Sequence, residues 1–446
     1  MTFPFHEAAR QHAEKIAFDD GVNRIAYGEL DRTIAQSKVM QISDLSPGDH
    51  VAWRPRNDLD AFLTFWAILK RRCVACPLSH RFPEVKRNEL LDRIDAKWLP
   101  DLLAERDDQT KEDQVDSASS PIRDDSSSPA TLILSSGSTG NPKAIVHSIS
   151  AHVQSAIGAA VNMPLGAGDR WLWSLPLYHI SGLSILVRCA VAGATVVGLS
   201  AQAKPSVRLL EQLGVTHLSV VSTQLRRLMD DESFRDSKLR YVLLGGSCVD
   251  SDLVARARSQ GISVSTTYGL TEMASQVTTS DAAVDPNTSG KLLPGREMKI
   301  ESGEIFVRGP MLCLGYYRDG QIESVVDEAG WFGTGDLGQL DEDQQLNVIG
   351  RMDNMFISGG ENIYPENIER AMLAAFEIRR VVVVPKPDEQ FGFRPVAFVD
   401  GSLPDLWEDE LRQGLSGFEI PVSILPWPLK DDESLKVDRK HLKSLV

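Results

Sequence analysis

The fold of this chain is decided by the stretch Leu134-Ser135-Ser136-Gly137-Ser138-Thr139-Gly140-Asn141-Pro142-Lys143. Six of its ten residues are serine, threonine or glycine, and the β-prone residues 130–134 lead into it. Glycines let a backbone turn tightly, so that successive N–H groups can point at phosphate oxygens. The hydroxyl groups add donors and Lys143 adds a positive charge. The stretch therefore predicts a phosphate-binding loop that follows a strand.

The spacing of this loop differs from that of the common nucleotide-binding loop, G-x-x-x-x-G-K-[ST]. Asn141 and Pro142 separate the last glycine from Lys143, and Ala144 stands where that motif has a magnesium-binding hydroxyl. From spacing alone, a flexible loop without a ligand remains the alternative.

The composition limits the classes of partner. The 446 residues suffice for roughly two to four domains, and the formal charge of −15 argues against a nucleic-acid partner and against an anionic membrane surface. We see neither a secretory signal nor an apolar run long enough for membrane insertion. The C-x-x-C pair Cys73 and Cys76 lacks a second pair that would complete a zinc site. We therefore expect buried thiols and a cytoplasmic protein.

Strands and helices alternate through the middle of the chain. Strands are predicted at 196–199, 216–221, 241–244 and 262–266, and helices at 206–213, 222–229 and 250–260. Such alternation indicates βαβ units and mostly parallel sheets, which makes the fold class α/β.

Polar or glycine-rich segments follow the carboxyl ends of these strands. They are residues 135–143, Ser222-Thr223-Gln224, Gly245-Gly246-Ser247 and Tyr268-Gly269-Leu270-Thr271-Glu272. Ligands of open α/β sheets bind at these strand ends, so we expect the four segments to form one nucleotide-type pocket.

The pattern changes after about residue 290. Short strands at 303–309 and 345–349 predict a small antiparallel β unit at the end of the large N-terminal domain. A glycine-rich loop, a helix that begins at Pro365, strands at 381–384 and 396–399, a helix near 406–415 and a terminal helix from Asp438 predict a small, mobile α+β C-terminal domain. We place the domains at 1–352 and 353–446.

The set of motifs resembles the adenylate-forming acyl-CoA synthetases, adenylation domains and luciferases. The likeness covers nearly the whole chain, and its most specific elements are the 135–143 loop, Tyr268 to Glu272, Trp331-Phe332-Gly333-Thr334-Gly335-Asp336, and Gly350-Arg351 followed by Ser358-Gly359-Gly360-Glu361-Asn362-Ile363. Within this family the chain most resembles the o-succinylbenzoate–CoA ligases of menaquinone biosynthesis. The short length and the runs at 143–147 and 175–182 suggest that branch.

The resemblance implies a two-step reaction with ATP, Mg²⁺ and coenzyme A. A carboxylate attacks the α-phosphate of ATP to give acyl-AMP and pyrophosphate, and the CoA thiol then displaces AMP. The implied phosphate-binding residues are Ser135, Ser138, Thr139, Gly140 and Lys143. Thr271 would donate to the α-phosphate and Glu272 would bind Mg²⁺. The rest of the nucleotide site would comprise Gly245, Gly246, Ser247, Tyr268, Gly269, Asp336 and Arg351.

The C-terminal residues have implied roles too. Lys436 matches the catalytic lysine of the family, although Leu435 replaces the usual glycine before it, which leaves Lys430, Lys440 and Lys443 as alternatives. Asp353 matches the hinge, and Gly359, Gly360 and Glu361 would line the CoA channel after a rotation of the small domain.

Arg188 carries the substrate prediction. It lies in an otherwise apolar stretch, and a buried arginine is rare without an anionic partner. One interpretation is a structural ion pair; the other, which the resemblance favours, is a clamp for the second carboxylate of an aryl diacid. His179 would gate the aryl or CoA tunnel, and Ser222, Thr223 and Gln224 would contact the succinyl chain.

Three alternatives stay open at this point. The chain could act on another aryl or acyl acid, load the phosphopantetheine of a carrier protein, or bind nucleotides without catalysis. For the CoA ligase that the resemblance favours, the expected partners are small molecules, namely the acid, ATP and CoA, and a homo-oligomer is possible.

Overall fold

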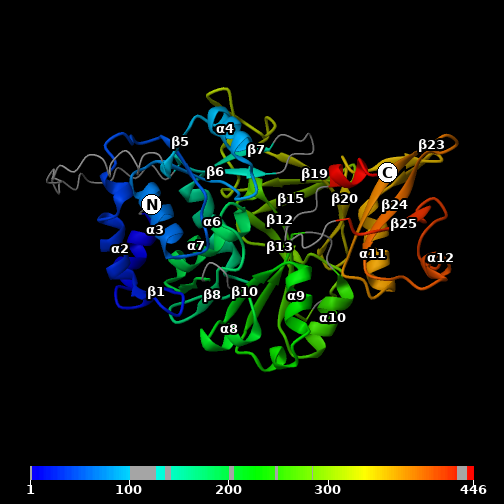
Figure 1. Ribbon diagram of the computed structural model, residues 1–446, viewed down its shortest axis with the longest axis horizontal. Coiled ribbons are helices and arrows are strands. Elements are labelled where there is room, and N and C mark those ends of the chain that lie inside the picture. Colours follow the sequence, from blue (N-terminus) through cyan, green and yellow to red (C-terminus); the bar gives the residue numbers. More distant parts are fainter. Residues whose placement is uncertain are drawn as a thin grey trace.

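The computed structural model describes residues 3–100, 127–135, 142–199, 205–246, 250–283, 285–428 and 439–446 (Figure 1). Five of the predicted site residues lie outside these ranges: Ser138, Thr139, Gly140, Ser247 and Lys436. The predicted fold class is confirmed, because mixed sheets with parallel centres and covering helices build the larger part of the molecule.

A nine-stranded sheet forms the centre of the fold, in the order β14-β13-β12-β11-β10-β8-β9-β1-β2. Its neighbours from β1 through β12 pair in parallel, whereas β2, β13 and β14 add antiparallel edges. The strands are β1 (Ile16–Asp19), β2 (Arg24–Ala26), β8 (Arg170–Leu172), β9 (Thr195–Val197), β10 (His217–Val220), β11 (Tyr241–Leu244), β12 (Val264–Leu270), β13 (Ser275–Thr279) and β14 (Lys291–Leu292).

A seven-stranded sheet carries the predicted phosphate loop, in the order β18-β17-β7-β6-β4-β3-β5. The strands are β3 (His50–Trp53), β4 (Val74–Pro77), β5 (Ala96–Trp98), β6 (Pro129–Ser135), β7 (Lys143–Ser148), β17 (Gly315–Arg318) and β18 (Gln321–Glu323). The four predicted polar segments therefore come from two sheets.

Helices fill the space between the two sheets and cover their outer faces. The inner layer contains α1 (Pro4–Gln11), α2 (Tyr27–Ala35), η1 (Lys38–Gln41), α3 (Leu59–Lys70), α6 (Ile149–Ala159) and α7 (Ile180–Ala192), which share one core with strands of both sheets. On the outside of the large sheet lie α8 (Val207–Gln212), α9 (Ser222–Met229), η2 (Glu232–Asp236) and α10 (Ser251–Ser259), and α4 (Glu84–Arg93) covers the smaller sheet.

Two smaller sheets complete the fold. The first, β15-β16-β19-β20, is the predicted antiparallel unit and consists of β15 (Glu297–Glu301), β16 (Glu304–Arg308), β19 (Phe332–Leu340) and β20 (Leu346–Arg351). The second contains β21 (Phe356–Ser358), β22 (Glu361–Ile363), β23 (Arg380–Asp388), β24 (Gly392–Asp400) and β25 (Ser423–Pro426), with α11 (Pro365–Ala375), α12 (Trp407–Leu411) and α13 (Arg439–Lys443). Figure 1 places it at the opposite end of the molecule from α2.

Several predicted boundaries differ from the structure. The strand expected at 262–266 continues to Leu270, because Thr267 to Leu270 pair with the edge strand β13. The glycine-rich loop after Arg351 is a β21–β22 hairpin that turns at Gly359 and Gly360, and the helix near 406–415 is limited to α12.

Cys73 and Cys76 are buried, and burial raises the pKa of the Cys73 thiol to about 11. No helix within the described ranges is long and apolar enough to cross a membrane.

The start of α7 is fixed by a close backbone contact. A Cβ atom on Gly182 would lie 2.1 Å from the carbonyl oxygen of Pro176 and 2.4 Å from that of Leu175. Because both obstacles are backbone atoms, a side chain can be accommodated only by displacing the helix that carries Arg188.

We expect Gly182→Ala to destabilise the protein by about 2–4 kcal/mol through this overlap. The measurement is thermal or denaturant unfolding, with Gly166→Ala as the matched control, because a Cβ atom on Gly166 meets nothing within 4 Å. Equal stabilities of the two variants would contradict the close packing of α7.

Candidate active site

Residues 268–275 form the centre of the site and join β12 to β13 through η3 (Thr271–Met273). The segment folds back so tightly that a Cβ atom on Gly269 would lie 2.2 Å from the carbonyl oxygen of Ser275. Ala274 closes the turn in the left-handed region, with φ 51°. Only glycine fits at position 269, which explains this residue of the predicted motif in steric terms.

Tyr268 connects this segment to the antiparallel unit. Its hydroxyl donates to Oδ2 of Asp336 at 2.7 Å, and Arg351 donates from Nη1 to Oδ1 of the same carboxylate at 3.0 Å. Burial, together with the nearby Asp336 charge, raises the pKa of the Tyr268 hydroxyl, and burial also raises the pKa of Asp336. Asp336 thus presents a fixed, largely buried carboxylate, which is suited to accept hydrogen bonds from two neighbouring ligand hydroxyls.

Arg351 extends this network to the predicted hinge. Its Nε donates to Oδ1 of Asp353 at 3.0 Å, and register pairing of β19 with β20 sets Arg351 opposite Asp336. The next residue, Asn354, donates to Oε1 of Glu366 on α11 at 2.6 Å. The predicted boundary therefore lies in a chain of polar contacts that runs from the site to the C-terminal unit.

Backbone contacts hold the two motif residues that follow β12. Nε2 of His147 donates to the carbonyl oxygen of Thr271 at 2.7 Å, and the N–H of Cys313 donates to the carbonyl oxygen of Glu272 at 2.7 Å. Burial lowers the pKa of His147 to about 4, so this imidazole is neutral at physiological pH. The η3 turn thus has a defined position before any ligand arrives.

Lys143 lies where the sequence predicts phosphate binding. Register pairing sets it opposite Ser135 where β6 and β7 meet, so both flanks of the predicted loop start from one hairpin. Nζ of Lys143 donates to the hydroxyl of Tyr316 at 3.3 Å, and this hydroxyl donates to Oε1 of Glu272 at 2.8 Å. The structure therefore brings the phosphate-loop lysine and the predicted magnesium ligand together.

The donor set near Glu272 fits a magnesium ion that arrives with phosphates. Among the described residues no cluster of three or more His, Cys, Asp or Glu side chains could hold a metal by itself. Mg²⁺ is commonly bound by one or two carboxylates plus substrate phosphates and waters. One carboxylate close to the lysine that is predicted to bind phosphate meets that description.

Two further predicted segments lie at the ends of neighbouring strands. Gly245 and Gly246 follow β11, and a Cβ atom on Gly245 would come within 2.8 Å of the Thr267 side chain. Ser222, Thr223 and Gln224 form the first turn of α9 after β10. There Oε1 of Gln224 accepts the N–H of Val221, so part of this side chain caps its own helix.

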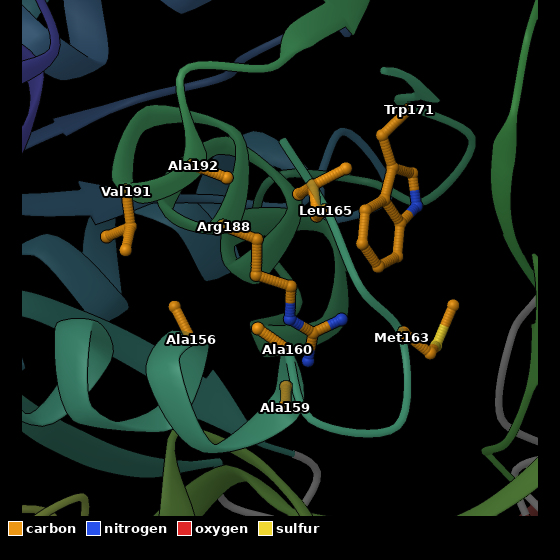
Figure 2. A pocket seen from close by; sticks show the side chains of 9 residues that line it. All are labelled: Ala156, Ala159, Ala160, Met163, Leu165, Trp171, Arg188, Val191 and Ala192. Carbon is orange, nitrogen blue, oxygen red and sulfur yellow. The ribbon is translucent and has the colours of Figure 1, made fainter. Parts of the chain in front are cut away.

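Arg188 projects from α7 into an apolar pocket (Figure 2). The pocket is lined by Ala156, Ala159, Ala160, Met163, Leu165, Trp171, Arg188, Val191 and Ala192. Figure 2 shows the guanidinium group directed between the α6 alanines and Trp171. It stacks 5.3 Å from the indole centroid, and its Nη2 donates to the Ser275 hydroxyl at 3.0 Å.

The charge of Arg188 has no carboxylate partner among the residues that the structure describes. Its buried Nε makes no hydrogen bond, and burial plus the nearby Arg296 lowers its pKa to about 9. Arg296 is itself buried and donates to the carbonyl oxygens of Gln276, Pro294 and Ser155. Within the described ranges, the structural ion pair considered for Arg188 is therefore not found.

The remaining predicted residues lie at the margins. His179 is the N-terminal cap residue of α7, half-buried, with its ring 4.7 Å from that of Tyr178. Gly359, Gly360 and Glu361 are exposed at the β21–β22 turn, where a Cβ atom added to Gly359 would lie 2.3 Å from the Phe418 ring.

Sequence reasoning missed Tyr316, His147 and Arg296. Alternation along β7 sets Lys143, Ile145 and His147 on one face of the strand, so His147 could have been proposed from its distance to the loop. Tyr316 comes from a strand 173 residues away from Lys143, and no local pattern indicates it.

Comparison with known proteins agrees with this geometry. Residues 5–317 match the family model described as AMP-binding enzyme. The 2-succinylbenzoate–CoA ligase of Escherichia coli (strain K12) is 37% identical over 413 residues, which are 90% of this chain and 88% of that enzyme. The chain belongs to the 2-succinylbenzoate–CoA ligase family of AMP-binding enzymes. This confirms the resemblance on which the sequence interpretation rests and identifies a ligase family that forms AMP.

Solved structures of this family share the whole fold. An arginine-to-lysine variant of E. coli MenE with bound OSB-AMS superposes with a TM-score of 0.84 at 32% identity, and the match covers 100% of this chain and 99% of that one. The O-succinylbenzoate coenzyme A synthetase (MenE) from Bacillus subtilis, in complex with ATP and magnesium ion, gives a TM-score of 0.84 at 27% identity, with 99% of each chain covered.

Proposed function

We propose that this chain is an acid–CoA ligase that activates 2-succinylbenzoate with ATP and then forms 2-succinylbenzoyl-CoA. The observation that carries the substrate choice is the buried Arg188, a cation without a carboxylate partner among the described residues, in a pocket of aryl-compatible lining. The relatives named above are 2-succinylbenzoate–CoA ligases, which supports the same choice.

The nucleotide would extend from Asp336 to Lys143. Asp336 would accept the ribose hydroxyls, Arg351 would hold that carboxylate in place, and Tyr268 would lie against the adenine. Thr271 would donate to the α-phosphate, while Gly245, Gly246, Ser247 and Gly269 would leave room for the nucleotide. Lys143, with Ser135, Ser138, Thr139 and Gly140, would hold the β- and γ-phosphates until pyrophosphate departs. Preset donors of this kind stabilise charge that develops in the transition state.

Magnesium would be held by Glu272 and would neutralise phosphate charge when bound. The protein's own contribution is to fix one carboxylate oxygen through Tyr316 and the main chain through Cys313. This arrangement keeps the other oxygen directed to a cation that the phosphates bring with them.

The two carboxylates of the acyl substrate would have different roles. The ring carboxylate would meet Arg188, and the succinyl carboxylate would attack the α-phosphate near Thr271. Ser222, Thr223 and Gln224 would contact the succinyl chain, and His179 would gate the tunnel. A buried guanidinium attracts an anion strongly because little water screens the pair.

The second step would use the C-terminal unit. Lys436 would bridge the carboxylate and the α-phosphate during adenylation, and rotation at Asp353 would then bring Gly359, Gly360 and Glu361 to the CoA channel. Residues 1–352 and 353–446 would be the two moving parts. The exposure of the 359–361 turn supports this proposal, because a surface turn is available for a new contact.

A cytoplasmic location is also part of the proposal. It is supported by the free, buried thiols of Cys73, Cys76, Cys189 and Cys313, which suit a reducing compartment.

The proposed reaction is tested by measuring pyrophosphate release over a set of mono- and dicarboxylic acids, followed by thioester analysis with free CoA. We expect the highest kcat/KM with 2-succinylbenzoate and complete conversion to its CoA thioester. Pyrophosphate release without transfer to free CoA would instead favour the loading of a carrier protein.

Arg188→Ala should lower kcat/KM for 2-succinylbenzoate by about 100-fold, because the ring carboxylate loses a buried charged partner. The matched substrate is 4-oxo-4-phenylbutanoate, which lacks the ring carboxylate, and its kcat/KM should change less than about threefold. A parallel loss with both acids would contradict the clamp, and a melting curve of the variant checks that it folds.

Lys436→Ala should abolish acyl-AMP formation and leave CoA transfer from supplied acyl-AMP within about twofold of wild type, since the lysine stabilises only the first transition state. Lys440→Ala and Lys443→Ala are the controls on α13, and both should retain adenylation. If either control loses adenylation while Lys436→Ala retains it, the catalytic lysine has been misassigned.

A further inference from the structure

Tyr316 lies between the two opposite charges at the phosphate end of the site. Its hydroxyl is within hydrogen-bonding distance of Nζ of Lys143, at 3.3 Å, and of Oε1 of Glu272, at 2.8 Å. An ammonium group can only donate, so the hydroxyl accepts from Lys143 and directs its single proton to Glu272. The direction of both hydrogen bonds is therefore determined.

Strand pairing fixes the position of this hydroxyl. β17 pairs with β7 in antiparallel fashion, with Tyr316 opposite Ile145, so the tyrosine lies next to the strand that begins at Lys143. The ammonium group also lies 5.0 Å from the centroid of the Tyr316 ring. The Tyr316 side chain is half-buried and belongs to a paired strand, so its hydroxyl has a fixed position.

The bridge keeps two oppositely charged groups from pairing directly. Lys143 and Glu272 form no ion pair with each other or with another described residue. Without the hydroxyl between them, the ammonium and the carboxylate would attract each other into direct contact in this partly buried place. Such a pair would have to be broken before either group could bind a ligand.

The hydroxyl also orients the carboxylate. It occupies Oε1 of Glu272, and no described group donates to Oε2. A carboxylate fixed through one oxygen offers the other in a defined direction, which is how hydrogen-bonded neighbours orient a metal ligand.

We propose that Tyr316 is a positioning residue for Mg·ATP: it separates Lys143 from Glu272 and presents the free oxygen of Glu272 to the cation. The inference rests on the proposed function for the roles of these two residues. It adds a third residue, from a different strand, that acts through both of them and contacts no reacting atom.

The neighbouring tyrosine provides a matched control. Tyr317 points to the opposite face of β17, is buried against the second face of the seven-stranded sheet, and packs edge-on to the His50 ring at 4.7 Å. Removal of its hydroxyl changes the same chemical group at the adjacent position without touching the charged pair.

The experiment is calorimetric titration of wild type, Tyr316→Phe and Tyr317→Phe with ATP in excess Mg²⁺, and with AMP in EDTA. We expect Tyr316→Phe to weaken Mg·ATP binding about tenfold, the loss of one charge-assisted hydrogen bond, and to leave AMP binding within twofold. Tyr317→Phe should change neither. Wild-type Mg·ATP affinity in Tyr316→Phe, or an equal loss for AMP, would overturn the proposal.

A double-mutant cycle with Glu272→Gln separates positioning from a structural role. In that background, Tyr316→Phe should alter Mg·ATP affinity less than twofold, whereas an undiminished tenfold effect would overturn action through Glu272. No acyl acid is present in these titrations. Failure of 2-succinylbenzoate as a substrate would therefore refute the proposed acyl substrate, and the nucleotide-binding roles on which this inference rests would still stand.

Discussion

The whole site depends on one close approach, that of the Gly269 backbone to the carbonyl oxygen of Ser275. It lets eight residues fold back on themselves between β12 and β13. Four sets of contacts meet on this short segment: Asp336 at Tyr268, His147 at Thr271, Tyr316 at Glu272 and Arg188 at Ser275. A side chain at position 269 would displace them all together. The conformation of the 268–275 turn thus has a steric origin, and the polar contacts of the site depend on that conformation.

Much of this site could be predicted from the sequence because its parts are local. Strand ends followed by glycine and hydroxyl residues indicate ligand contacts wherever they occur in an α/β chain. This pattern predicts Thr271 and Glu272 as ligand contacts, and it predicts the segment from Ser135 to Lys143 in the same way. The distribution of these segments over two sheets could not be predicted, because no periodicity records which sheet a strand joins. Contacts made across sheets, such as that of Tyr316, are equally invisible in a local pattern.

Arg188 illustrates a different limit. An arginine in an apolar helix predicts burial, but burial alone does not separate an internal ion pair from a ligand site. The decision rests on which residues surround the guanidinium group, and these come from α6, β8 and β13. In the described chain they are alanines, a tryptophan and a serine, together with a second arginine. Two buried cations without a carboxylate partner among the described residues are unfavourable, which supports the proposal that Arg188 binds an anionic substrate.

The acidic chain thus concentrates positive charge at the places where anions are expected. Arg188 contacts Ser275 directly at one end of the 268–275 segment and has Arg296 nearby, whereas Lys143 is connected through the Tyr316 hydroxyl to Glu272 within the segment. Ser275 and Glu272 are three residues apart on a tightly folded backbone. A ligand that draws Arg188 away from Ser275 therefore removes one of the restraints on the turn that carries Glu272. The same turn would serve the acyl pocket and the phosphates, so binding of an acyl group at Arg188 would alter the restraints on Glu272. The coupling free energy between the two sites would be small, because only a few hydrogen bonds connect them.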